Sequence, residues 1–427
     1  MSTARHASAQ IDYNGKAVKA DFTDDTSSMT YTDPASGESD SLSITLEDAD
    51  RRWTAAWFPV KGDAISAKIA LTDWMDDGDN REIDCGAFVL SGFSMQGAPG
   101  TVSLEAVAQP VDLAWSTTER SKTWEKITAQ EIAADMAGRA GLALTYDAEA
   151  ISIDAIEQNK KPDSSFLQEL CDKYGLQMKV YAKKLILYDR AKYKEKPAAA
   201  TIPIEEVAAG WTYNTDLVGS YTGGTIAYTD PKTEKDIVYK YNETSPRLLE
   251  VTEKADSAAD AEKRLKAEIE KANHGLTTLS VTLMGGLYEV YAGQCVEMTG
   301  FGRLSGKYYV DKVTHELSTS GYSMQLELAL VSSGTDAAMQ DALDRLTAAG
   351  IMNSPEYWAD KMDQVPYLSD LLLNLSVMTN GAGGGTTDDP VAALQAAGVI
   401  NTPDYWTQAA QSVPYLDQLL QNAAGAL

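Results

Sequence analysis

The chain holds few side chains whose type and spacing suit catalysis. Its 427 residues include three histidines, His6, His274 and His315. None belongs to an H-E-x-x-H metal motif, and neither a P-loop nor a G-x-S-x-G nucleophile motif is present. His315 stands beside Glu316 in a strand pattern, where a packed or hydrogen-bonded residue is a simpler interpretation than a general base. We therefore predict no enzyme activity, no catalytic residue, no metal site and no cofactor.

The acidic residues offer two alternatives. The segment Asp76-Asp77-Gly78-Asp79-Asn80 has part of the composition of a calcium loop, but it lacks the twelve-residue spacing and closing Glu of an EF-hand. A solvated hairpin tip explains it more simply. A glycosidase would need two converging carboxylates among the 62 acidic residues, and nothing in the sequence marks such a pair. A peptidoglycan-targeting enzyme stays as an alternative function.

The cysteine positions and the net charge limit the classes of protein to which the chain can belong. Cys85, Cys171 and Cys295 lie far apart in apolar patterns, which predicts buried thiols and no disulfide framework. The formal net charge is −26, and a DNA-binding protein needs a positive surface, so we expect no specific nucleic-acid binding. The negative charge could serve solubility, or part of it could line a channel and repel passing DNA. No apolar run is long enough to span a membrane, and residues 1–6 lead into no signal-peptide core.

A tandem repeat in the C-terminal region carries the candidate binding residues. Residues 346–358 recur as 394–406, and the sequence V-P-Y-L recurs at 365–368 and 413–416. Each copy reads as three short helices, with a glycine stop followed by a Ser or Thr N-cap and a proline. The aromatic side chains could stack on sugars, or they could form the core of so small a unit. The candidate ligand-binding residues are Tyr357, Trp358, Tyr367, Tyr405, Trp406 and Tyr415.

Several domains must position these residues, because 427 residues are too many for one hydrophobic core. We predict a mainly β protein with two small antiparallel β-barrels, an α/β insert domain and two C-terminal three-helix repeats. The predicted boundaries are 1–112 for the first barrel, 113–200 for the insert, 201–333 for the second barrel with a charged helix at 256–273, 334–379 for the first repeat, 380–388 for a Gly-rich linker and 389–427 for the second repeat.

The two barrels are predicted from period-two alternation between turn signals. Residues 42–46 alternate cleanly, and Asn14-Gly15 predicts a type I′ hairpin turn. From 276 to 331 the chain again alternates short strand patterns with glycines and never falls into a helical period. Strands this short cannot be stable as a single hairpin, so each region should close on itself or pack against another sheet.

The insert is predicted from helical signals that interrupt the strands. Thr128 and Glu131 form a capping box at the start of one helix, and Asp163 is expected to cap a second helix that Gly175 ends. Phe166 and Leu167 should lie on the buried face of the second helix. A hairpin that turns at 183–184 follows.

The order of these elements resembles a known family. Its local motifs are Gly306-Lys307-Tyr308-Tyr309-Val310 followed by Val313-Thr314-His315-Glu316, and the acidic turn 46–48 ahead of an aromatic-Pro-x-x-Gly-Asp segment. This arrangement resembles the phage late-control and tail-hub family over most of residues 1–331. The family includes the baseplate hubs of contractile tails, among them those of Bacillus-type defective prophages, and the hub of type VI secretion spikes.

The resemblance implies a homotrimer that adapts a threefold spike to a sixfold tail tube around a central channel. Its implied partners are the tail tube protein, the central spike, other baseplate proteins and the tape-measure protein. The implied location is the tail baseplate of a virion or phage-like particle, after synthesis in a bacterial cytoplasm. The repeats are similar to those of cell-wall-associated phage proteins of Gram-positive hosts, which implies peptidoglycan as a ligand. A cell-wall-binding protein is the second alternative.

Overall fold

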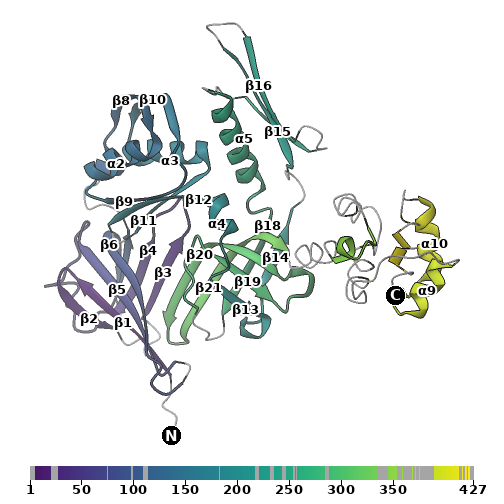
Figure 1. The fold of residues 1–427 in the computed structure, drawn as a ribbon. Coiled ribbons are helices and arrows are strands. Elements are labelled where there is room, and N and C mark those ends of the chain that lie inside the picture. The colour runs from purple at the N-terminus through teal and green to yellow at the C-terminus, as the bar shows by residue number, and fades with distance from the viewer. Residues whose placement is uncertain are drawn as a thin grey trace. The chain divides into compact units, whose positions relative to one another are not determined.

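The computed structural model describes most of residues 5–333 and parts of the C-terminal region (Figure 1). The described ranges are 5–20, 27–74, 76–97, 100–108, 114–181, 183–216, 221–230, 235–242, 247–252, 255, 257–283, 288–333, 345–352 and 389–412, together with Trp358, Leu368, Leu371, Leu375, Leu416, Leu419, Leu420, Asn422 and Ala423. The chain divides into two compact units. Unit 1 comprises Met1–Phe301 and Lys307–Val331, and unit 2 comprises Gly302–Gly306 and Ser332–Leu427.

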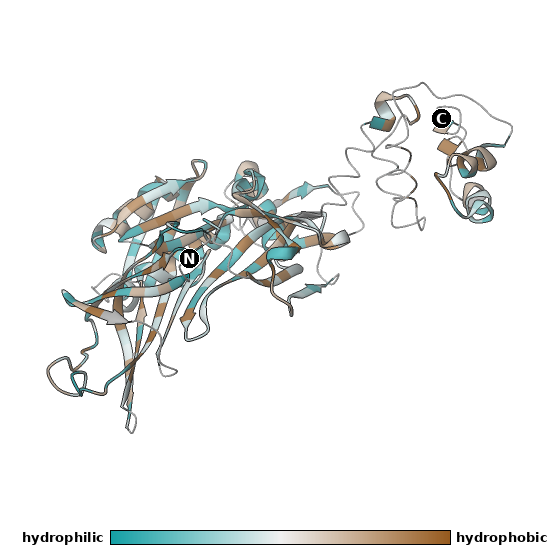
Figure 2. Cartoon of the chain, turned by 90° about the horizontal axis from the view of Figure 1, so that it is seen from below, coloured by the Kyte–Doolittle hydropathy of each residue, from teal (hydrophilic) through white to brown (hydrophobic). Residues whose placement is uncertain are grey.

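The N-terminal half of the main sheet in unit 1 is built from strands with alternating polar and apolar residues. These strands are β1 (His6–Tyr13), β2 (Lys16–Ala20), β3 (Ser28–Pro34), β4 (Ser41–Glu47), β5 (Ala64–Thr72), β6 (Arg81–Gln96) and β7 (Thr101–Val107). Figure 2 shows the alternation along the strands. In β4 it buries Leu42 and Ile44 and leaves Ser43 half-exposed. The predicted hairpin turn is confirmed, because Asn14 and Gly15 have φ of 50° and 78° between β1 and β2.

The insert of unit 1 places helices against two small sheets. Its elements are α1 (Ala114–Thr117), β8 (Arg120–Thr128), α2 (Ala129–Arg139), β9 (Ala143–Asp147), β10 (Ser152–Lys161), α3 (Asp163–Tyr174), β11 (Leu176–Tyr181), β12 (Lys184–Asp189) and α4 (Arg190–Glu195). The Thr128–Glu131 capping box is confirmed at the start of α2. Phe166 and Leu167 are buried in the core that α2, α3 and the strands share, as predicted.

The predicted cap of α3 is wrong. Pro162 occupies the N-cap position without a side-chain hydrogen bond, and Asp163 lies inside the first turn. There its buried carboxylate accepts hydrogen bonds from Arg139 Nε at 2.9 Å and Gln158 Nε2 at 2.8 Å. The side chain therefore satisfies groups from other elements instead of the end of its own helix.

The C-terminal half of the main sheet follows the insert, together with a separate three-stranded sheet and α5. Its elements are β13 (Ala200–Pro203), the 3₁₀ turn η1 (Ile204–Glu206), β14 (Thr212–Thr215), β15 (Gly223–Asp230), β16 (Lys235–Tyr241), β17 (Leu248–Val251), α5 (Ala258–Asn273), β18 (Thr277–Leu283), β19 (Cys295–Thr299), the 3₁₀ turn η2 (Gly302–Leu304), β20 (Gly306–Ser318) and β21 (Gly321–Ser333). The charged helix predicted at 256–273 is α5. Its apolar stripe, with Leu265 and Ile269, packs on Ile226 of a separate sheet ordered β16-β15-β17.

The strands do not form the two closed barrels that the alternation predicts. Those of both halves belong to one 13-stranded sheet with the order β14-β18-β21-β20-β3-β4-β7-β6-β5-β1-β2, with β19 beside β20 and β13 beside β19. No sheet of the described residues closes into a barrel. The reason lies in the length of β20, which pairs with β19 as well as with β3, so one strand continues the sheet from one half into the other.

The two halves repeat one strand order. The first half runs β3-β4-β7-β6-β5-β1, and the second runs β14-β18-β21-β20-β19-β13. Each pairing has its counterpart, and the outermost pairings differ in direction: β1 is antiparallel to β5, whereas β13 is parallel to β19. In this correspondence β6 is the counterpart of β20, and β14 is the counterpart of β3.

Unit 2 contains α9 (Pro390–Ala396) and α10 (Pro403–Ser412) and has its own hydrophobic core. Equivalent positions of the two sequence repeats are buried together in this core: Leu346 and Leu394, Ile351 and Val399, Met352 and Ile400, Trp358 and Trp406, Leu368 and Leu416, Leu371 and Leu419, Leu375 and Ala423. Asn422 Nδ2 also donates to the carbonyl of Ile351 at 3.1 Å. The two copies thus share one core. The linker predicted at 380–388 lies outside the described residues.

Candidate functional site

Strand β3 pairs with residues 312–317 of β20 at a junction that we call the seam (Figure 1). Polar side chains gather at this junction. His315 of β20 is paired with Tyr31 of β3, and their rings stack with centroids 5.5 Å apart. His315 Nδ1 lies 2.8 Å from the hydroxyl of Tyr322. Burial lowers the pKa of His315 to about 4, so its ring is neutral at physiological pH. His315 is the packed, hydrogen-bonded strand residue that the sequence predicts.

A lysine of the insert reaches the seam from β11. Lys179 forms ion pairs with Asp33 and, at 3.3 Å, with Asp40, and all three side chains are largely buried. Tyr31 donates to the second oxygen of Asp40 at 2.9 Å. Burial raises the pKa of Asp40 to about 7 and lowers the pKa of Lys179 to about 7. This cluster therefore fixes the insert to the first half of the sheet through buried polar groups that are costly to leave without a partner.

Further polar contacts tie the insert to both halves of the sheet and to α5. Tyr188 of β12 donates to the carbonyl of Ala35 at 2.9 Å and lies at the same distance from the hydroxyl of Tyr309. Arg190 and Lys194 both bond the carboxylate of Glu270 on α5, at 3.0 and 2.7 Å. Burial opposes ionisation of Glu270, yet Lys194 and Arg190 together hold its pKa below the usual value. The insert is thus bound to both halves of the sheet and to α5.

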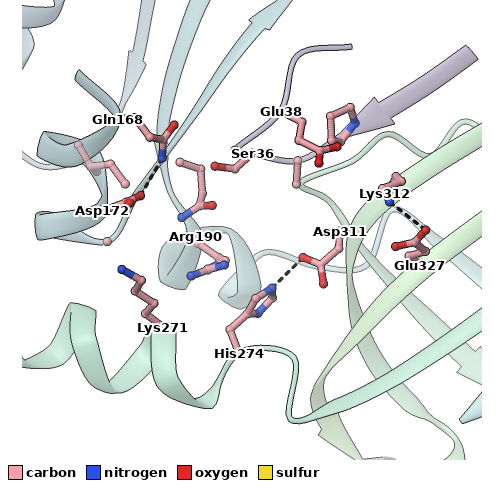
Figure 3. A pocket seen from close by; sticks show the side chains of 16 residues that line it. Ser36, Glu38, Gln168, Asp172, Arg190, Lys271, His274, Asp311, Lys312 and Glu327 are labelled. Atoms are coloured by element: carbon pink, nitrogen blue, oxygen red, sulfur yellow. Dashed lines mark hydrogen bonds and ion pairs between the residues drawn. The ribbon is translucent and has the colours of Figure 1, made fainter. Parts of the chain in front are cut away.

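A pocket of about 650 Å³ adjoins the seam (Figure 3). His274 Nε2 lies 2.7 Å from Asp311 Oδ1, and Lys312 Nζ donates to Glu327 at 3.0 Å. Gln168 closes a third pair by donating to Asp172 at 2.7 Å. Six of the polar side chains that line the pocket are thus paired with one another.

Among the other groups that the sequence singled out for possible chemistry, the cysteines and Asp79 are packed or paired, whereas His6 and Asp76 are exposed. Cys85, Cys171 and Cys295 are free and buried as predicted, and burial raises the pKa of each thiol. In the acidic segment 76–80, Asp79 accepts from Arg81 at 2.9 Å within the turn between β5 and β6. Within the described ranges, no group of three or more His, Cys, Asp or Glu side chains is placed to hold a metal ion.

The six candidate aromatic residues of the repeats are described only in part. Tyr357, Tyr367 and Tyr415 lie outside the described residues. Trp358 and Trp406 are 5% and 3% exposed and contribute to the shared core, while Tyr405 packs against it and stays half-buried. Ligand binding by these residues remains a prediction, and Tyr405 is the described candidate with an accessible ring surface.

Two strand edges form a second candidate site that the sequence did not reveal. Beyond Leu90, β6 continues through residues 91–96, for which the only recorded strand partner among the described residues is β7. At the other end of the sheet β14 pairs with β18 alone within the same ranges. Large apolar side chains are exposed near these strands, with Phe58 at 56% and Trp211 at 38%. Isolated exposed aromatics in loops and short strands give no distinctive sequence pattern.

Comparison with known proteins shows relatives in phage tails. A family described as YQBQ-like matches residues 117–329. The chain is 25% identical to the probable baseplate hub protein of Escherichia phage 186, over 76% of this chain and 92% of the relative. It is also 25% identical to that of Escherichia phage P2, over 77% of this chain and 94% of the relative. These matches support a baseplate hub family.

The fold has counterparts among solved tail proteins. The tail protein from Neisseria meningitidis MC58 superposes with a TM-score of 0.57 at 14% identity, covering 76% of this chain and 96% of that one. This likeness shows a shared fold, and the two curated relatives support a baseplate hub and a place in the phage tail. No helix in the described part of the chain is both long and apolar enough to cross a membrane.

Proposed function

We propose that this protein is the hub of a contractile-tail baseplate, in which three copies adapt a threefold spike to a sixfold tail tube. The observation that carries the proposal is the repeated strand order, β3-β4-β7-β6-β5-β1 and β14-β18-β21-β20-β19-β13, within one chain. Two similar half-sheets per chain give six similar elements in a trimer. Such a ring can meet a hexameric tube without a symmetry mismatch.

The mechanism follows from symmetry and not from a reactive side chain. A closed threefold ring requires a heterologous interface, in which one surface of a copy meets a different surface of the next. The tube and spike would then bind opposite faces of the ring, and the chain would surround the central channel. Acidic residues lining that channel would repel passing DNA, which is consistent with a net charge of −26.

Native mass measurement tests the assembly. The purified chain should give a trimer of about 138 kDa, which is three times 46.1 kDa, or should contribute three copies to a complex with its tube or spike protein. A chain that stays monomeric with both partners present would contradict the proposal, and so would a symmetric dimer. In a structure of the trimer, Asp and Glu should be enriched on the channel wall, and an even distribution would leave only solubility as the role of the charge.

For unit 2 we propose cell-wall binding. The favouring observation is that its two repeats share a core of their own, with Tyr405 half-buried at its surface. A chain truncated after Ser333 should stay folded and assemble, and the fragment 336–427 should sediment with purified Gram-positive peptidoglycan. Tyr357→Ala combined with Tyr405→Ala should weaken sedimentation without loss of helical circular dichroism. Failure of the truncated chain to fold or assemble, or full binding by the double variant, would contradict this role.

A further inference from the structure

We infer that neighbouring copies join through the strand edges that the seam uses inside one chain. Residues 91–96 of β6 in one copy would pair antiparallel with β14 (Thr212–Thr215) of the next copy. We call these two segments the open edges. The inference rests on the proposed trimer and names the residues that would form its interface.

The first argument is the correspondence between the two halves. The long strand β20 pairs with β19 and, through residues 312–317, with β3. Its counterpart β6 pairs with β5 through residues 81–89 and continues through 91–96 without a further recorded partner on that side among the described residues. The counterpart of β3 is β14, which pairs on one side only within those ranges. Among the described residues, each open edge therefore lacks the strand partner that its counterpart has.

The second argument is the difference in burial along β6 and β20. Val313, His315 and Leu317 alternate on one face of β20 and are all buried. On β6, Phe93 and Met95 lie opposite the buried Leu104 and Val102 of β7, and hence on the core-facing side of the sheet. Both are nevertheless only half-buried. An adjacent strand would cover them, as β3 covers β20.

The third argument is the matching difference between β3 and β14. Tyr31 of β3 is paired with the buried Leu42 and is 4% exposed. Tyr213 of β14 is paired with the buried Leu279 in the same way, yet it is half-buried and the other three residues of its strand are exposed. Tyr31 owes part of its burial to the stacked ring of His315 across the seam. Tyr213 has the corresponding position on an open edge.

The side chains near the open edges suit an aromatic cross-strand interface. Phe93 meets the exposed Phe58 edge-on, with centroids 5.5 Å apart, and Trp211 precedes β14. Aromatic pairs across neighbouring strands stabilise a sheet. Exposed edges with apolar side chains invite a further strand, which natural proteins otherwise block with charge or proline. A second copy of this chain fits, since each copy offers both edges, and the third copy closes the ring.

Lysine variants test the edges separately. Phe93→Lys places a charge on the β6 edge, and Tyr213→Lys places one on the β14 edge. Under conditions in which the unmodified chain is trimeric, each variant should lose the mass of about 138 kDa and remain at 46.1 kDa. The matched control is Val238→Lys, which adds the same charge to an exposed position of β16 and should leave the trimer intact.

A mixture of the two edge variants gives the most decisive test of the proposed interface. The Tyr213→Lys chain keeps an intact β6 edge, and the Phe93→Lys chain keeps an intact β14 edge. One interface can then form, which gives a heterodimer of about 92 kDa, twice 46.1 kDa, that cannot close. If Phe93→Lys reduces thermal stability, Met95→Lys replaces it on the same edge.

The outcomes separate the interface from the proposed function. Trimers formed by both edge variants would overturn the inference and leave the hub proposal standing. Loss of tube or spike binding by variants that still trimerise would assign the edges to another tail protein, which also overturns it. An unmodified chain that stays monomeric with both partners would overturn the hub proposal itself.

Discussion

The seam and the open edges are built from corresponding strands, and they differ in what covers them. At the seam, β20 and β3 bury Tyr31, His315 and Leu317, and Lys179 of the insert reaches the same place. At the open edges the corresponding segments of β6 and β14 keep Phe93 and Tyr213 half-buried. The difference indicates that one strand arrangement serves folding inside the chain and, in our proposal, assembly between chains.

The comparison also assigns a role to the polar groups. A buried ion pair adds little net stability relative to apolar residues, but removal of one partner is costly. Such a cluster suits a junction that stays formed throughout the life of the folded chain. Half-exposed aromatics suit a junction that forms when another copy arrives, because an exposed apolar edge invites a further strand.

The largest effect is expected at the cluster in the seam. Lys179→Met should reduce the free energy of unfolding by roughly 3–5 kcal/mol, because it leaves Asp33 and Asp40 buried without their cation. Chemical denaturation measures this loss. Lys68→Met removes a lysine from an exposed pair with Glu82 and should change the midpoint little. Equal midpoints for the two variants would show that the cluster does not hold the insert to the sheet.

A second pair of variants compares a core-facing residue of the seam with a core-facing residue of an open edge. Leu317→Ala, in the seam, should cost about 2–5 kcal/mol because it leaves a cavity beside β3. Met95→Ala, on the open edge, should cost about 1 kcal/mol in the monomer, since its side chain is only half-buried. Chemical denaturation measures the loss of stability in both variants. Comparable losses would mean that Met95 already has a covering partner within one chain.

The pH dependence of stability should reveal Asp40. Its pKa is raised from 3.8 to about 7 on folding, so the folded state binds the proton more tightly than the unfolded state. The stabilisation from this group is complete below about pH 4 and is lost as pH rises through about 7. Asp40→Asn should therefore flatten the decline in unfolding free energy between pH 4 and 7. An unchanged decline in that variant would place the titration elsewhere.

Sequence patterns predicted individual turns, helix caps and buried residues, but they did not predict which distant strands pair with each other. The Asn14-Gly15 turn, the Thr128 capping box and the burial of Phe166 follow from interactions within a few residues, so they could be foreseen. The pairing of β20 with β3 joins segments far apart in the chain, and alternation cannot say which strand lies beside which.

The candidate site was hidden for the same reason. Lys179 and Asp33 are 146 residues apart, and a lysine in an alternating strand is typical of a solvated face. The repeat was visible in the sequence, yet whether Trp358 and Trp406 face a ligand or a core depends on how two copies pack. The open edges became apparent only once both halves could be compared strand by strand.

Hydrogen exchange of backbone amides tests the central claim most directly. In the monomer, amides of β3 and of residues 312–317 should exchange slowly, whereas those of β14 and of residues 91–96 that point outward from the sheet should exchange quickly. On assembly, the account predicts new protection at both open edges, approaching that of the seam. Assembly that protects other segments and leaves both edges in fast exchange would contradict it.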